Sequence, residues 1–309
     1  MKKNLLFIVI ISFLTSCSTS ETTSSFNYEG VWKRIGQIKY ENGVGTDTLI
    51  FPEGSIRRNG VFSPGFRYKI YGSGHSIWFD SSKKVDRDKK ILEENNDMFA
   101  KTSYKIENDS LFEIFNFWHD NANPMMENWK LGKDGFHYRA KLESVGEDKY
   151  VQYNLRPDGS RSWGEFYQRV DTYNVTPSDL TGAWKRVYTV RYRDGKVLDT
   201  VPYKSQELSD VGSYIIAGDT KRIWAFNVKN RNEEGLDISP GSAQLSNYSL
   251  LDGKISDTIV WANTFVREIY KRAEYNGVRV RNYTIKDNIF SMTNVNANGN
   301  GAIVVFEKE

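Results

Sequence analysis

The chain contains one long internal repeat, and this feature limits the possible folds most strongly. Residues 30–34 (GVWKR) return as residues 182–186 (GAWKR), 152 positions later. Further matches keep the same order at offsets of 146 and 144, namely 68–72 with 214–218, 77–78 with 223–224, and Tyr104 with Tyr248. A chain of 309 residues has room for two domains of about 150 residues each. We therefore predict a duplicated domain, with the boundary in the polar stretch 171–177.

Turn signals indicate that each copy is built from β-strands. Nine Asn-Gly or Asp-Gly dipeptides occur, and these are the strongest short-range signals for a β-hairpin, because type I′ turns need positive φ at both central residues. Alternating apolar and polar residues flank several of them, as in 151–155 (VQYNL) and 188–192 (YTVRY). This period of two favours antiparallel strands with one buried face. The expected fold class is all-β, either an up-and-down barrel or a sandwich in each half.

Two segments leave their secondary structure open. The charged segment 84–100 permits a helix or an exposed hairpin loop. The segment 265–275 has a helical composition, but its alternation also permits a strand.

The N-terminus has the layout of a bacterial export signal. Lys2 and Lys3 precede the apolar run 5–14, which is too short to span a bilayer as a helix of about 20 residues but suits a secretory signal peptide. Residues 14–17 (LTSC) resemble the lipobox of bacterial lipoproteins. In that family the cysteine thiol receives a diacylglycerol, the peptide is cut before the cysteine, and the new amine is acylated. The resemblance implies that Cys17, the only cysteine of the chain, is the lipid attachment site.

This resemblance also implies where the protein resides. An Asp after the cysteine often retains enteric lipoproteins in the inner membrane, so Ser18 favours the outer membrane. We expect a protein of the bacterial cell envelope, held to the membrane by its acyl chains, on either the periplasmic or the surface side. The expected segments are a signal peptide at 1–16, a flexible tether at 17–26, a first barrel at 27–171, a linker at 172–178 and a second barrel at 179–309.

Charge and composition exclude several classes of function. The net charge of +3 includes Lys2 and Lys3, and without them 40 basic residues face 39 acidic ones, which gives no basic surface for nucleic acid. Three histidines and one cysteine form no metal-binding motif, and no nucleotide-binding or hydrolase motif occurs. We expect no catalytic residue, no metal and no cofactor. The basic segments 56–59 and 83–90 are interpreted as solvated surface.

The start of each copy resembles a known family. Residues 180–184 (LTGAW) are similar to the Gly-x-Trp motif with which lipocalins begin their first strand, and residues 27–32 are a weaker copy. The closest resemblance is to the lipocalin-like domains of Bacteroidetes lipoproteins, which implies two tandem antiparallel up-and-down β-barrels. In lipocalins a basic residue near the last strand covers the tryptophan. The resemblance therefore implies that Arg169 covers Trp32 and Lys308 covers Trp184 at the barrel bases, where each cation would lie over an indole face.

Further aromatic residues are candidates for a ligand pocket. Small barrels of this kind can hold one ligand among inward-facing side chains, and the alternative is ordinary core packing. The candidate ligand-binding residues are Tyr68, Trp78, Phe117, Tyr214, Trp224 and Trp261.

Three functional hypotheses follow. The first is a membrane-anchored, non-enzymatic lipoprotein that binds a small apolar or amphipathic ligand in its barrels. The second is a cell-surface module that binds a glycan or a protein through exposed aromatics such as Trp118 and Trp129. The third is an envelope hydrolase that uses His119 with Asp120 or Glu127, although neighbouring strand residues point to opposite faces.

Overall fold

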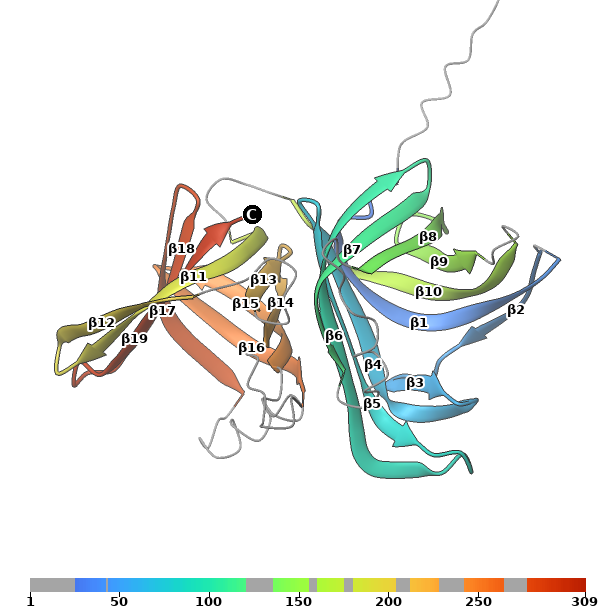
Figure 1. Cartoon of the computed structure of the whole chain (residues 1–309), viewed down its shortest axis with the longest axis horizontal. Coiled ribbons are helices and arrows are strands. Elements are labelled where there is room, and N and C mark those ends of the chain that lie inside the picture. The colour runs from blue at the N-terminus through green and yellow to red at the C-terminus, as the bar shows by residue number, and fades with distance from the viewer. Residues whose placement is uncertain are drawn as a thin grey trace, which may run out of the picture.

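The computed structural model shows an all-β protein with two closed antiparallel barrels of eight strands each (Figure 1). The prediction of two tandem up-and-down β-barrels is therefore confirmed. The structure describes residues 26–42, 44–120, 136–155, 160–174, 180–203, 212–227, 242–263 and 277–309. Among these residues, no helix is long and apolar enough to cross a membrane.

Barrel 1 closes through β1, which pairs with β10 on one side and with β4 on the other. Two further strands lie outside the ring, because β2 pairs with β1 and β3 pairs with β4. The strands are β1 (Gly30–Glu41), β2 (Val44–Ile50), β3 (Ser55–Arg58), β4 (Val61–Gly72), β5 (His75–Val85), β6 (Ile91–Glu107), β7 (Ser110–Asp120), β8 (Phe136–Ser144), β9 (Lys149–Leu155) and β10 (Arg161–Asp171).

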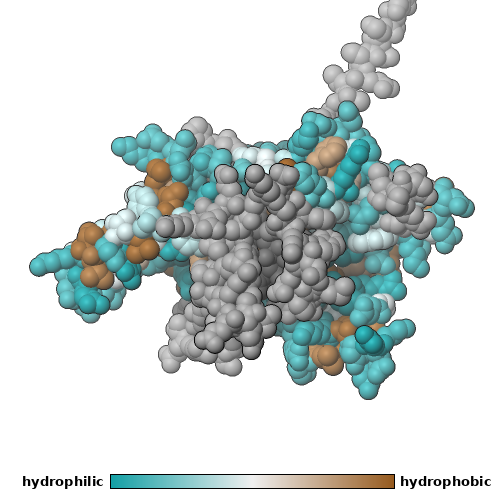
Figure 2. All heavy atoms as spheres, viewed as in Figure 1, coloured by the Kyte–Doolittle hydropathy of each residue, from teal (hydrophilic) through white to brown (hydrophobic). Residues whose placement is uncertain are grey.

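Barrel 2 repeats this plan. Its first strand, β11, pairs with both β13 and β19, and β12 extends from β11 outside the ring. The strands are β11 (Gly182–Arg193), β12 (Lys196–Pro202), β13 (Gly212–Ala217), β14 (Lys221–Asn227), β15 (Ser242–Leu251), β16 (Lys254–Ala262), β17 (Val278–Lys286), β18 (Ile289–Val295) and β19 (Gly301–Lys308). The hairpin formed by β11 and β12 projects from the barrel and carries exposed hydrophobic surface (Figure 2).

Hairpin turns explain why the strands stop where they do. Asn59, Asp194 and Asp252 adopt φ values of 47°, 51° and 50°, and each precedes a glycine with positive φ, as type I′ turns require. The charged segment 84–100 forms no helix: β5 ends at Val85 and β6 begins at Ile91, so this segment is a hairpin with a short turn. Segment 265–275 lies outside the described residues.

The barrels pack side by side through corresponding strands, β4–β6 of barrel 1 and β13–β15 of barrel 2 (Figure 1). The apolar cluster between them contains Val31, Ile70, Ile77, Phe79 and Phe99 of barrel 1, Ala183, Tyr214, Ile216, Ile223, Ala225, Ala243, Leu245 and Trp261 of barrel 2, and Tyr173. Its centre is the stack of Phe79 on Trp261, whose ring centroids lie 4.4 Å apart. These strands therefore bury both faces, one inside a barrel and one against the other barrel.

The segment that joins the barrels is held at one end of the molecule. The Asp171 carboxylate accepts hydrogen bonds from the Thr220 and Lys221 amides, at 2.9 and 2.8 Å. The Asp219 carboxylate accepts a bond of 2.6 Å from the Thr172 hydroxyl in return. These bonds connect the end of β10 to the β13–β14 turn, so the bases of the two barrels lie at the same end of the molecule.

Candidate functional site

The base of barrel 1 is closed by an indole ring under a guanidinium. Trp32 is fully buried, and its Nε1 donates a hydrogen bond of 2.8 Å to the Tyr28 carbonyl. The Arg169 guanidinium lies 4.2 Å from the centre of the Trp32 ring and donates to the carbonyls of Asn27 and Glu29. The cation therefore covers the indole and also ties the incoming chain across the base.

The base of barrel 2 has the same plan with fewer contacts. Trp184 Nε1 donates a hydrogen bond of 2.7 Å to the Leu180 carbonyl. The Lys308 ammonium lies 5.4 Å from the Trp184 ring centre. An ammonium is a point charge, so it cannot bridge two carbonyls in the planar manner of Arg169.

The candidate pocket aromatics divide into two groups. Trp78 lies inside barrel 1 and Trp224 lies inside barrel 2. Tyr68, Tyr214 and Trp261 instead belong to the cluster between the barrels, so they face the other barrel and not an interior. Residues 68 and 78 differ in facing because their strands, β4 and β5, pair Tyr68 with Phe79 and Lys69 with Trp78.

Several other candidates fall where side chains are not described. Phe117, Trp118 and His119 belong to strand β7, but their side chains lie outside the described part of the chain. Trp129 and Glu127 lie outside the described residues altogether, as does Cys17.

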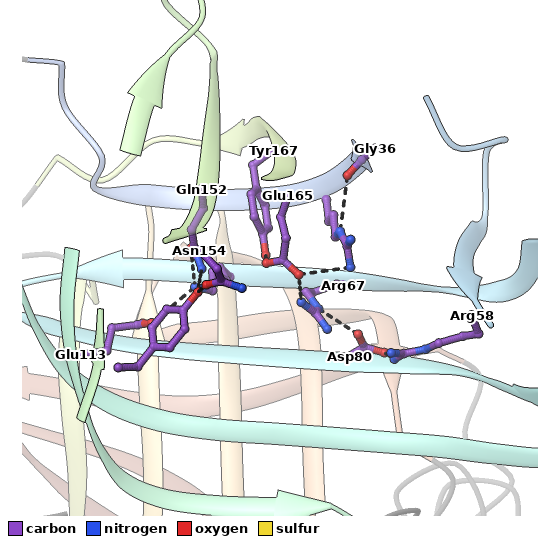
Figure 3. A network of polar contacts seen from close by, with 12 residues as sticks. Gly36, Arg58, Arg67, Asp80, Glu113, Gln152, Asn154, Glu165 and Tyr167 are labelled. Carbon is purple, nitrogen blue, oxygen red and sulfur yellow. Dashed lines mark hydrogen bonds and ion pairs between the residues drawn. The ribbon is translucent and has the colours of Figure 1, made fainter. Parts of the chain in front are cut away.

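The interior of barrel 1 contains an alternating row of charges (Figure 3). Asp80 on β5 binds Arg58 from β3 and accepts a bond of 2.8 Å from Arg67 Nε. Arg67 also binds Glu165 on β10, and Arg34 on β1 lies 3.2 Å from the same carboxylate oxygen. We call these five residues the arginine row. It holds three guanidiniums and two carboxylates, so it carries one positive charge in excess.

The two guanidiniums that bind Asp80 are the most accessible members of the arginine row, and that of Arg67 belongs to a side chain that is 15% exposed. The side chains of Asp80 and Glu165 are 0% and 7% exposed, whereas that of Arg58 is 22% exposed. At the other end, the Arg34 guanidinium lies 5.4 Å from the Phe51 ring centre and 5.7 Å from that of Trp163, which is 41% exposed. Both ends therefore approach the open end of the barrel, opposite to the base.

The ion pairs and the burial shift the pKa values of three members of the row, Glu165, Arg34 and Arg67. Burial alone would raise the pKa of Glu165, but the charges of Arg67 and Arg34 outweigh it and lower that pKa to about 2. Burial lowers the pKa of Arg34, against the effect of Glu165. Burial likewise opposes the charge of Arg67, yet Glu165 and Asp80 together raise its pKa above the ordinary value. Glu165 is therefore ionised at neutral pH.

A second polar group lies deeper in barrel 1. Lys69 Nζ is 2.9 Å from both the Tyr71 hydroxyl and Gln152 Oε1, and 3.6 Å from a Glu113 oxygen. Ser76 donates to Glu113 at 3.1 Å. These groups satisfy one another, so this layer serves the packing of the barrel and leaves the arginine row as the charged surface nearest the opening.

Sequence reasoning missed the arginine row. Arg58 was interpreted as solvated surface, but it reaches into the barrel to Asp80. The partners Arg67 and Glu165 lie 98 residues apart, so no local motif joins them. One available signal was Arg34 itself, because the repeated motif conserves a basic residue two positions after each tryptophan. Among the described residues, His, Cys, Asp and Glu side chains form no group of three or more that could hold a metal ion.

Comparison with known proteins yields little. No protein family model matches the chain, and no curated protein matches it. Among the solved structures that match, an uncharacterized protein from Bacteroides eggerthii DSM 20697 has 19% identity over 42% of this chain and 100% of its own, at a TM-score of 0.26. A TM-score this low supports no structural argument, so the interpretation of the site depends on its geometry.

Proposed function

We propose that the chain is a membrane-anchored, non-enzymatic lipoprotein with lipocalin-like barrels, and that barrel 1 binds a small amphipathic ligand with an anionic end. The observation that carries this proposal is the positive charge in excess on the arginine row. A buried charge without its own counter-ion is costly, and a ligand anion would supply that counter-ion. Guanidinium groups suit a carboxylate or phosphate because their donors match its geometry.

The surroundings of the row suit the apolar part of such a ligand. Phe51 and Trp163 lie beside Arg34, and Phe62 packs edge-to-face on Phe51 with ring centroids 6.0 Å apart. Phe62 and Trp163 are 37% and 41% exposed. An amphipathic molecule could place its charged end on the row and its apolar part on these rings.

A titration of the protein with dodecanoate and with neutral dodecan-1-ol tests this proposal. We expect dodecanoate to bind at least tenfold more tightly than dodecan-1-ol. Arg58→Gln should lower the affinity for dodecanoate about tenfold, because it removes the positive charge in excess from the row. Arg58 is the variant of choice since Asp80 keeps its bond to Arg67. Arg139→Gln is the matched control, because Arg139 is exposed on β8, lies over the Phe112 ring and has no part in the arginine row. Equal binding of the acid and the alcohol, or unchanged binding in Arg58→Gln, would contradict the proposal.

Anchoring through Cys17 is the second part of the proposal, and it gives the barrels an orientation. Phe26, the first described residue, packs 5.9 Å from the Trp32 ring at the base of barrel 1. Only eight residues separate Cys17 from Phe26, and at about 3.5 Å per residue they span at most roughly 30 Å. A lipid on Cys17 would therefore hold the bases toward an outer membrane and leave the open ends facing away from it.

Detergent phase separation of the protein from a bacterial host tests the anchor. We expect the wild type in the detergent phase, with an intact mass that shows cleavage before Cys17 and added acyl chains. Cys17→Ala should move the protein to the aqueous phase, since it removes the acceptor thiol. An acylation-free mass for the wild type would contradict the anchor and leave the ligand proposal for barrel 1 unaffected.

A further inference from the structure

Barrel 2 contains an arginine, Arg186, at the position that corresponds to Arg34 in barrel 1. The positions that correspond to the carboxylates of the arginine row hold no acidic residue. Arg186 follows Arg34 by 152 positions, and both precede a register shift, in β11 and β1 respectively. In barrel 1, Glu165 on β10 is the cross-strand partner of Gln37 on β1. At the corresponding place in barrel 2, Val304 on β19 is the cross-strand partner of Thr189 on β11. An apolar residue has thus replaced the acid.

The second acid of the arginine row is replaced as well. Arg67 pairs with Asp80 across β4 and β5, and the corresponding pair across β13 and β14 is Ser213 with Phe226. Arg186 is left with two hydrogen bonds to the Thr189 hydroxyl, at 3.2 and 2.5 Å, and with the Tyr203 ring at 4.9 Å. Within the described parts of the chain it forms no ion pair, and burial lowers its pKa.

Three aromatic rings continue from this guanidinium. The Tyr203 and Phe226 centroids lie 6.2 Å apart, and Phe226 stacks on Trp224 at 5.8 Å and 21°. Trp224 Nε1 donates a hydrogen bond of 3.1 Å to the Ser213 hydroxyl, which fixes the indole. Arg186 and all three rings are only partly buried, so each retains accessible surface. We call these four residues the aromatic row.

We propose that the aromatic row is a second binding site, for a small organic carboxylate attached to a flat apolar body. The carboxylate would pair with Arg186, and the flat body would lie against Tyr203, Phe226 and Trp224. A guanidinium binds a carboxylate through two parallel hydrogen bonds, and ring faces favour stacked or edge contacts with another flat group. This site lies in the other barrel from the arginine row and shares no residue with it.

The test uses naphthalene-2-carboxylate as the probe and neutral 2-naphthamide as its isostere, followed by calorimetry and by quenching of tryptophan fluorescence. We expect the full protein to bind the carboxylate at least tenfold more tightly than the amide. Arg186→Gln should lower carboxylate affinity tenfold or more and leave amide binding unchanged. Arg186→Lys should recover part of the loss, because it restores the charge but not the planar pair of donors.

Two controls make the outcome decisive. Arg191→Gln, on the same strand but in an exposed pair with Asp199, should bind the carboxylate as the wild type does. Arg58→Gln in barrel 1 should also leave naphthalene-2-carboxylate binding unchanged, which separates this site from the arginine row. The proposal is overturned if the wild type binds neither probe, if it binds both equally, or if Arg58→Gln and not Arg186→Gln causes the loss. Unchanged thermal unfolding of Arg186→Gln would show that the loss does not come from misfolding.

Discussion

At the scale of single residues, ionised groups inside barrel 1 are stable only as a set. Arg67 bridges two carboxylates, so removal of either acid leaves a buried guanidinium with less compensation. Glu165 is the most informative member because two arginines and the Tyr167 hydroxyl, at 2.7 Å, hold it in its ionised form.

Acid should therefore destabilise the protein through Glu165. Its folded-state pKa of about 2 lies below the ordinary value of 4.5, so its stabilising contribution is complete above about pH 5 and disappears as the pH falls toward 2. This shift corresponds to about 2 kcal/mol of unfolding free energy lost between pH 7 and pH 3. We expect Glu165→Gln to be less stable at pH 7 but to lose about that much less on acidification, measured by urea unfolding at each pH.

A surface acid provides the control for this acidification experiment. Glu53 also bonds a cation, Lys33, but its side chain is 90% exposed and solvent screens the pair. Glu53→Gln should therefore show the wild-type loss of stability between pH 7 and pH 3. If Glu165→Gln loses as much as the wild type, then Glu165 is not held ionised by the row.

At the scale of strands, the sequence pattern predicts which strands pair better than it predicts which side chains point into the barrel. Alternation and Asn-Gly or Asp-Gly turns predicted antiparallel hairpins, which form as expected because both signals are local. Alternation also places Tyr68 and Lys69 on opposite faces, but it does not say which face is inside. In β4, Tyr68 faces the other barrel and Lys69 faces the barrel interior. Both faces of this strand are buried, so alternation alone does not show which of them is inside.

Two glycines of barrel 2 allow the cost of backbone strain in a turn to be distinguished from the cost of a steric clash of an added Cβ. Gly301 begins β19 with φ of 146°, and a Cβ there would overlap the Asn294 carbonyl. Gly253 lies in the β15–β16 turn with φ of 69°, and a Cβ there would meet no atom within 4 Å. We expect Gly253→Ala to cost about 1 kcal/mol of unfolding free energy, the cost of a left-handed non-glycine residue, and Gly301→Ala to cost about 3 kcal/mol or more. Equal costs in denaturant unfolding would contradict the crowding at Gly301.

At the scale of the whole molecule, the two copies of the repeat are joined by a shared apolar cluster. The repeat was visible in the sequence, but the contact between the copies was not, because its residues come from nine strands and look like ordinary strand aromatics and aliphatics. Barrel 1 contributes large side chains such as Phe79 and Phe99, where barrel 2 has Ala225 and Ala243. The two faces are therefore complementary in size, and each barrel would expose an apolar surface without the other.

This interface should make the two barrels unfold together. Phe79 is fully buried and stacks on Trp261, so Phe79→Ala removes a ring and leaves a cavity between the barrels, at a cost of about 3–5 kcal/mol. We expect scanning calorimetry to show one transition for the wild type and two for Phe79→Ala, because the coupling between the barrels is weakened while each interior is intact. Val280→Ala is the control, since Val280 is 58% exposed on β17, and it should keep a single transition near the wild-type temperature. Two transitions in the wild type would mean that the barrels are independent and that the shared cluster does not couple them.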